Sequence, residues 1–76
     1  MLKNKIDSVL SLKGKNINDF CKRYNISQPN ISQKGKKNSY YLKEGVLFAD
    51  FINTDLCFVD RETGEVLGKL TLEDIQ

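Results

Sequence analysis

Histidine and tryptophan are absent from this 76-residue chain, and cysteine occurs only twice. Without histidine the chain lacks the commonest general base and the commonest metal ligand. Cys21 and Cys57 stand too far apart in the sequence for the paired spacing of a zinc site. The chain also has no nucleophile motif and no glycine-rich phosphate loop. We therefore expect no enzymatic activity, no bound metal and no cofactor.

Long apolar runs are missing as well. No stretch approaches the roughly 20 apolar residues that a membrane-spanning helix requires, and no secretory signal pattern precedes the first helix. Two cysteines in such a chain are typical of free thiols in a reducing compartment. We expect a cytoplasmic protein that neither enters a membrane nor acts on a small-molecule substrate.

The charges that are present are distributed unevenly. Residues 1–37 contain nine lysines or arginines and two aspartates, a net charge of +7. Residues 38–76 contain three basic and eight acidic residues, a net charge of −5. A basic half of this kind attracts polyanions, of which nucleic acid is the commonest. The alternative is an ordinary solvated surface on which the charges segregate by chance.

Apolar residues at helical spacing predict four helices, at about 2–13, 17–24, 28–34 and 41–52. Apolar residues make up 39% of the chain, enough for one modest core, so we predict a single domain over residues 1–76. In the last of these helices we expect Leu42, Val46, Ala49 and Ile52 to form the apolar stripe, followed by Asn53 as a left-handed cap.

The segment between the second and third helices is rich in capping residues. Asn16 is a good N-cap for the second helix, and Asn25 tolerates the left-handed conformation that would end it. Ser27 has the position of a second N-cap, and Pro29 follows in the first turn of the third helix. We expect Gly35 to end that helix.

The third helix has few apolar residues of its own, so it cannot be stable alone. Ile26 and Ile31 would hold it against its neighbours and leave its amides facing outward. The run at 34–39 then predicts a basic loop. Tyr40 and Tyr41 are adjacent, so at most one faces the core. The other either contacts a sugar–phosphate or a partner surface, or is a partly buried aromatic residue, and we favour the second interpretation.

The C-terminal part changes character. Two β-prone runs flank the turn residues 60–64, and a type I turn with Gly64 in the left-handed position fits their spacing. We predict a hairpin with strands at 55–60 and 65–70. Residues 71–76 are either a frayed end or a short turn. Because an isolated hairpin is marginal in water, it needs a helix or a partner strand.

Residues 14–34 resemble the helix-turn-helix of the Cro/repressor (XRE-like) family of DNA-binding proteins. The family pattern of cap, small buried residue, turn, aliphatic residue and serine cap is matched by Asn16, Cys21, Asn25, Ile26 and Ser27. The likeness covers about residues 3–56, and the terminal hairpin resembles the Cro-type subgroup. The resemblance implies an α+β fold, with a four-helix helix-turn-helix core at 2–53 and a hairpin at 55–70 that makes a homodimer.

By this resemblance the third helix enters the major groove of double-stranded DNA. Gln28, Asn30 and Gln33 can each offer an amide donor–acceptor pair to an adenine edge. Ser32 either bonds a phosphate or faces solvent, and the basic run beside it would contact the DNA backbone without reading sequence. The expected DNA-binding residues are Asn16, Ser27, Gln28, Asn30, Ser32, Gln33, Lys34, Lys36, Lys37 and Asn38.

The sequence thus favours a dimeric, Cro-like transcriptional repressor of a phage or other mobile element. We expect the dimer interface to be the shared apolar layer of Leu56, Phe58, Val66 and Leu70. The alternative is a small antagonist that keeps the helix-turn-helix shape and binds another protein through its acidic half. Ile17 and Gly35 bear on this choice, because the family usually has glutamine and a buried aliphatic residue at these two positions.

Overall fold

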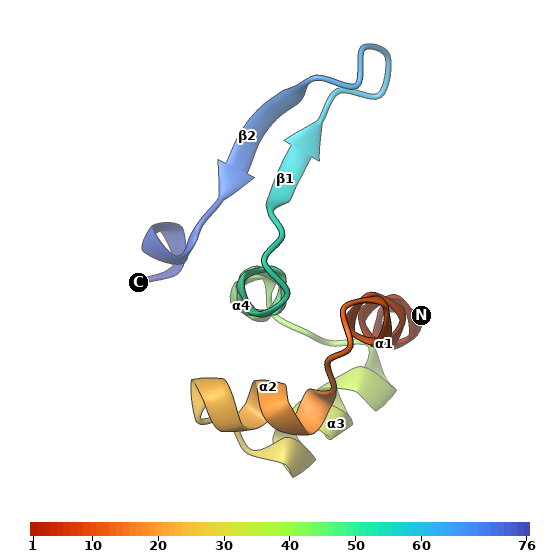
Figure 1. Ribbon diagram of the computed structural model, residues 1–76, viewed down its shortest axis with the longest axis vertical. Helices are drawn as coiled ribbons and strands as arrows, with labels where there is room; N and C mark the ends of the chain where they lie inside the picture. The colour runs from red at the N-terminus through yellow and green to blue at the C-terminus, as the bar shows by residue number, and fades with distance from the viewer. The chain divides into compact units, whose positions relative to one another are not determined.

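The computed structural model describes all 76 residues. Four α-helices precede a two-stranded antiparallel sheet, which confirms the predicted α+β class (Figure 1). The elements are α1 (Leu2–Leu12), α2 (Ile17–Tyr24), α3 (Gln28–Lys37), α4 (Leu42–Phe51), β1 (Leu56–Val59), β2 (Val66–Leu70) and the 3-10 helix η1 (Leu72–Ile75). The chain forms two compact units, Met1–Tyr41 and Leu42–Gln76. The fourth helix therefore lies in the same unit as the hairpin, whereas the sequence pattern predicts it in one helical core with the first three.

The first unit is built around α3, which contacts both α1 and α2 (Figure 1). Phe20 of α2 and Ile31 of α3 are both 0% exposed, and Leu10 of α1 is almost as deeply buried. The ring of Tyr24 lies 5.0 Å from that of Phe20, centroid to centroid. Burying these apolar side chains stabilises three helices that would be marginal in isolation.

Both ends of α2 follow the predicted capping chemistry. The side-chain oxygen of Asn16 accepts a hydrogen bond from the backbone N–H of Asp19, at 3.0 Å. Asn25 adopts the left-handed conformation, with φ 55° and ψ 48°. The N–H of Ile26 then bonds to the carbonyl of Cys21 at 2.9 Å and closes the turn. Ser27 has the predicted N-cap position of α3, but its hydroxyl accepts no cap hydrogen bond.

The predicted end of α3 at Gly35 is wrong. The helix continues to Lys37 and ends at Asn38, which takes the left-handed conformation with φ 53°. The predicted basic loop at 34–39 is therefore helical as far as residue 37. Gly35 is buried, and a Cβ placed on it would lie 2.7 Å from the hydroxyl oxygen of Tyr40 and 3.2 Å from Cδ of Lys3. Glycine serves here for close packing, not for a change of chain direction.

In the second unit, α4 buries Glu44, Val46, Phe48 and Phe51, and Ile52 follows them into the apolar interior. Asn53 is left-handed, with φ 58°, as predicted. Leu42 does not join the buried stripe, because it stands at the first position of the helix and is 66% exposed.

None of the helices has both the length and the apolar character needed to cross a bilayer.

The hairpin pairs Leu56 with Leu70 and Phe58 with Gly68, and the register then shifts so that Val59 pairs with Val66. One extra residue, Leu67, is accommodated at this bulge. Gly64 has the predicted left-handed conformation, with φ 75°. Of the two alternatives for residues 71–76, the chain forms a short turn, because Thr71 and Asp74 make a reciprocal capping box at the start of η1.

Candidate nucleic-acid interface

The candidate interface is the outward face of α3. Ile31 and Gly35 are buried and lie four residues apart, so they mark the face of α3 that packs inward. Asn30, Gln33 and Lys37 follow one another at intervals of three and four residues on a different side, and all three are exposed. Two amides and a cation therefore share one face of a helix whose opposite face is fixed in the core.

The longer helix changes how the basic residues are presented. Lys36 and Lys37 belong to the last turn of α3, together with Lys34, and the helix contains no acidic residue. Three cations near the negative end of a helix dipole stabilise that end. The lysines also extend the amide face by one turn. The predicted residues Lys36 and Lys37 thus lie beside Gln33 on regular helix, and not on a loop.

Gln28, Ser32 and Lys34 lie outside the centre of this face. Gln28 is exposed at the first helical position, while Ser32 and Lys34 are half-buried. The ammonium of Lys34 stands 4.2 Å from the centre of the Tyr41 ring, in a cation–π contact. Tyr40 is the partly buried member of the tyrosine pair and Tyr41 the exposed one.

Asn16 and Asn38 are both predicted to contact DNA. Both are exposed, and the side-chain oxygen of each accepts a hydrogen bond from a backbone N–H of this chain. Asn16 caps α2, and the oxygen of Asn38 accepts a hydrogen bond from the backbone N–H of Leu2 at 3.0 Å. Each side chain keeps its NH₂ group, which can donate to a phosphate. Asn38 also ties the end of α3 to the start of α1, 36 residues earlier.

The remaining ionisable groups of the first unit leave its surface basic. Lys3 is paired with Asp7 at 2.7 Å, and this hydrogen bond raises the pKa of the Lys3 ammonium above its ordinary value. Burial raises the pKa of the Cys21 thiol, so it remains neutral and behaves as a small core side chain. Exposed cations elsewhere on this unit are Lys5, Lys13, Lys15, Lys22 and Arg23.

The predicted dimer residues divide into two pairs. Leu56 and Leu70 are opposite one another and half-buried, whereas Phe58 and Val66 are exposed. Sequence reasoning missed Val59 and Leu67, which are also exposed. The bulge brings Val59 opposite Val66. An alternating pattern of residues predicts the pairing of an undistorted strand only, so it does not predict this pair. We call Phe58, Val59, Val66 and Leu67 the apolar tip of the hairpin.

Nowhere in the structure do three or more cysteine, aspartate or glutamate side chains lie so that they could hold a metal ion together. Comparisons with protein-family models, with curated proteins and with solved structures found no match for this chain. A function must therefore be argued from the chemistry of the α3 face and of the hairpin.

Proposed function

We propose that this protein binds double-stranded DNA through the outward face of α3 and regulates transcription as a dimeric repressor of the Cro-like kind. The observation that carries the proposal is the composition of that face. Exposed amides and lysines occupy it without an acidic residue, on a helix anchored by the fully buried Ile31. The proposal includes no catalytic role.

The dimensions and chemistry of α3 support a major-groove contact. Its 10 residues span about 15 Å, and the groove is about 12 Å wide, wide enough for one helix. Asn30 and Gln33 would donate to and accept from adenine edges. Lys36 and Lys37 would contact phosphates and supply affinity that does not depend on sequence.

The apolar tip of the hairpin supports a homodimer. Phe58 and Leu67 are each 65% exposed. The sheet has only two strands, so each strand has one edge that pairs with no other strand of the chain. One end of the hairpin contacts α4, but the tip stays exposed, and exposed apolar surface of this kind commonly marks a protein–protein contact. A second copy would cover it and would also place a second α3 on the DNA, which multiplies the few contacts that one small domain can make.

The test compares three single alanine variants on a duplex selected from a random DNA pool, by fluorescence anisotropy over a range of salt concentrations. Gln33→Ala should cost about 1–3 kcal/mol and relax specificity at one position, because a base contact is lost. Lys36→Ala should weaken binding to all duplexes and reduce the salt slope by about 1. Arg61→Ala, which removes the same charge from the hairpin turn, is the matched control.

Two results would contradict DNA binding through α3. In the first, affinity falls equally in Arg61→Ala and Lys36→Ala, so that only total charge matters. In the second, neither α3 variant changes DNA binding or the regulation of a reporter gene, while substitutions in the acidic half abolish that regulation. The second result is the one expected of a protein-binding antagonist.

A further inference from the structure

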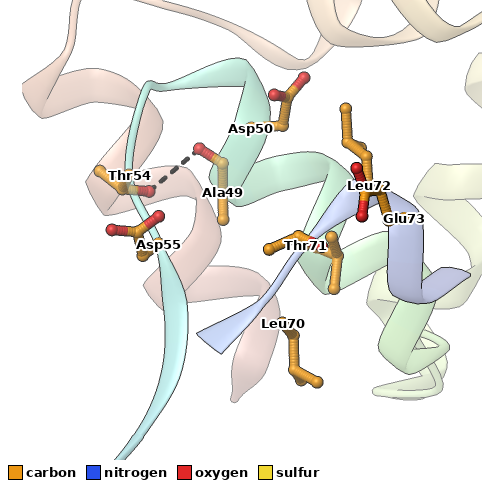
Figure 2. A pocket seen from close by; sticks show the side chains of 9 residues that line it. Ala49, Asp50, Thr54, Asp55, Leu70, Thr71, Leu72 and Glu73 are labelled. Atoms are coloured by element: carbon orange, nitrogen blue, oxygen red, sulfur yellow. Dashed lines mark hydrogen bonds between the residues drawn. The ribbon is translucent and has the colours of Figure 1, made fainter. Parts of the chain in front are cut away.

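The second unit contains an open groove of about 410 Å³ that the proposed function does not use. Its walls come from the second half of α4, the link to β1, the end of β2 and the start of η1 (Figure 2). The lining residues are Val46, Ala49, Asp50, Thr54, Asp55, Leu70, Thr71, Leu72 and Glu73. Its volume lies within the range of about 300–1,000 Å³ that is usual for binding pockets.

The groove is held in shape by hydrogen bonds within its own walls. The hydroxyl of Thr54 donates to the carbonyl of Ala49 at 3.1 Å (Figure 2), and the backbone N–H of Thr54 donates to the same carbonyl at 2.9 Å. On the other wall, the carboxylate of Asp74 accepts from the N–H of Thr71 at 2.8 Å. A pocket that is already formed loses less conformational entropy when it is filled.

The chemistry of the lining is aliphatic and acidic. Leu70, Leu72 and Ala49 provide apolar surface, and the three carboxylates of the lining bring negative charge. No lysine or arginine lines the groove, although Lys69 pairs with Asp55 at 3.2 Å beside it. The unit as a whole has three basic and eight acidic residues. The complementary ligand is an aliphatic group next to a cation.

The first unit presents this combination at the end of α1. Leu12 is 84% exposed, Lys13 follows it, and both belong to what we call the basic corner, residues 12–15. The backbone of the corner forms a closed turn, in which Gly14 is left-handed with φ 68° and the N–H of Lys15 bonds to the carbonyl of Leu10 at 2.8 Å. An exposed aliphatic side chain next to cations, on a backbone fixed by hydrogen bonds, is a suitable occupant for an apolar groove with acidic walls.

We propose that the groove of one chain binds the basic corner of a second chain, with Leu12 against Leu70 and Leu72. Lys13 would then lie among the carboxylates. Two different surfaces meet in such a contact, so it is head-to-tail, and successive copies can form a row. The contact is small, so the association is weak and depends on protein concentration. It does not depend on DNA binding or on the hairpin contact.

Complementation between two disabled variants tests the proposal, with Phe58→Asp present throughout to remove the hairpin contact. One variant disables the corner, by Leu12→Ser with Lys13→Glu. The other disables the groove, by Leu72→Ser with Glu73→Lys. All four residues are exposed, so both proteins should fold. Lys22→Glu and Glu62→Lys make the same charge changes elsewhere and serve as controls.

The readout is sedimentation velocity, together with ¹⁵N chemical shifts of one variant titrated with the other. Each disabled variant alone should associate at least about tenfold more weakly than the Phe58→Asp parent. Mixing the two should restore a one-to-one complex, because each retains the surface that the other has lost. The shifted resonances should map to the groove in one partner and to the corner in the other. The control variants should behave like the parent.

Three results would overturn the proposal. A Phe58→Asp parent that stays monomeric to about 1 mM would assign the groove to a different partner. Disabled variants that associate as well as the parent would move the contact to another surface. A mixture no stronger than either variant alone would show that the corner and the groove do not meet.

Discussion

At the scale of single residues, Gly35 shows most clearly how tertiary packing can determine which residue a position holds. It lies inside α3, where glycine costs about 1 kcal/mol relative to alanine, yet Tyr40 and Lys3 occupy the space that a side chain would need. The flexible Lys3 can move aside at little cost. The hydroxyl of Tyr40 is attached to a stiff ring, so it presents the main obstacle to a larger residue.

For this residue we predict that the effect of Gly35→Ala on stability changes sign when the Tyr40 hydroxyl is removed. Gly35→Ala should bring little gain or a loss of stability in the parent protein, because the new Cβ meets the Tyr40 hydroxyl at 2.7 Å. In a Tyr40→Phe background the same change should stabilise the protein by about 1 kcal/mol, since only the helix propensity is then felt. Urea unfolding of the four proteins of this cycle measures the coupling. Equal effects in both backgrounds would show that the hydroxyl is not the obstacle.

At the scale of elements, three helices end at asparagine in the left-handed conformation, namely Asn25, Asn38 and Asn53. They differ in what the side chain does. Asn38 accepts the N–H of Leu2 and so joins α3 to α1, whereas Asn25 ends α2 through its backbone alone. The same residue type is thus a local stop signal at one helix end and a tertiary link at another.

Glycine substitutions separate these two roles. Asn25→Gly relieves the left-handed strain but adds entropy to the unfolded chain, so the stability should change by no more than about 0.5 kcal/mol. Asn38→Gly makes the same backbone change and also loses the hydrogen bond to α1, so it should be less stable than Asn25→Gly by about 1 kcal/mol. Thermal unfolding by circular dichroism provides the comparison. Identical stabilities would mean that the Leu2–Asn38 bond contributes nothing measurable.

At the scale of the whole molecule, the main features are the opposite charges of its two halves and the exposed apolar tip of the hairpin. If the proposed homodimer forms through the hairpin, Phe58→Asp should weaken it at least about tenfold, because the substitution places a charge in the apolar layer. Thr63→Asp adds the same charge at the exposed turn and should leave the proposed dimer intact. Analytical ultracentrifugation across a dilution series measures both. A Phe58→Asp protein as dimeric as its parent would place the interface elsewhere.

Much of this architecture was determined by the sequence itself. The bounds of α2, its asparagine cap, its left-handed exit and the glycine of the hairpin turn are all set by residues within about four positions of one another. Capping and turn chemistry act over that range, so they can be recognised without a fold. The exposed amides of the candidate site were predicted for the same reason, from the position of the single buried isoleucine in α3.

Only the tertiary structure decided where α3 ends, which unit contains α4 and which apolar residues the hairpin leaves uncovered. Gly35 has the sequence signature of a helix stop, but Tyr40 and Lys3 converge on it, and Lys3 comes from 32 positions earlier in the chain. Likewise, the bulge at Leu67 depends on pairing between two strands. Contacts between distant residues set these features, and no short-range pattern encodes them. The placement of Lys36 and Lys37 on the same helix as Gln33 could therefore be determined only from the folded chain.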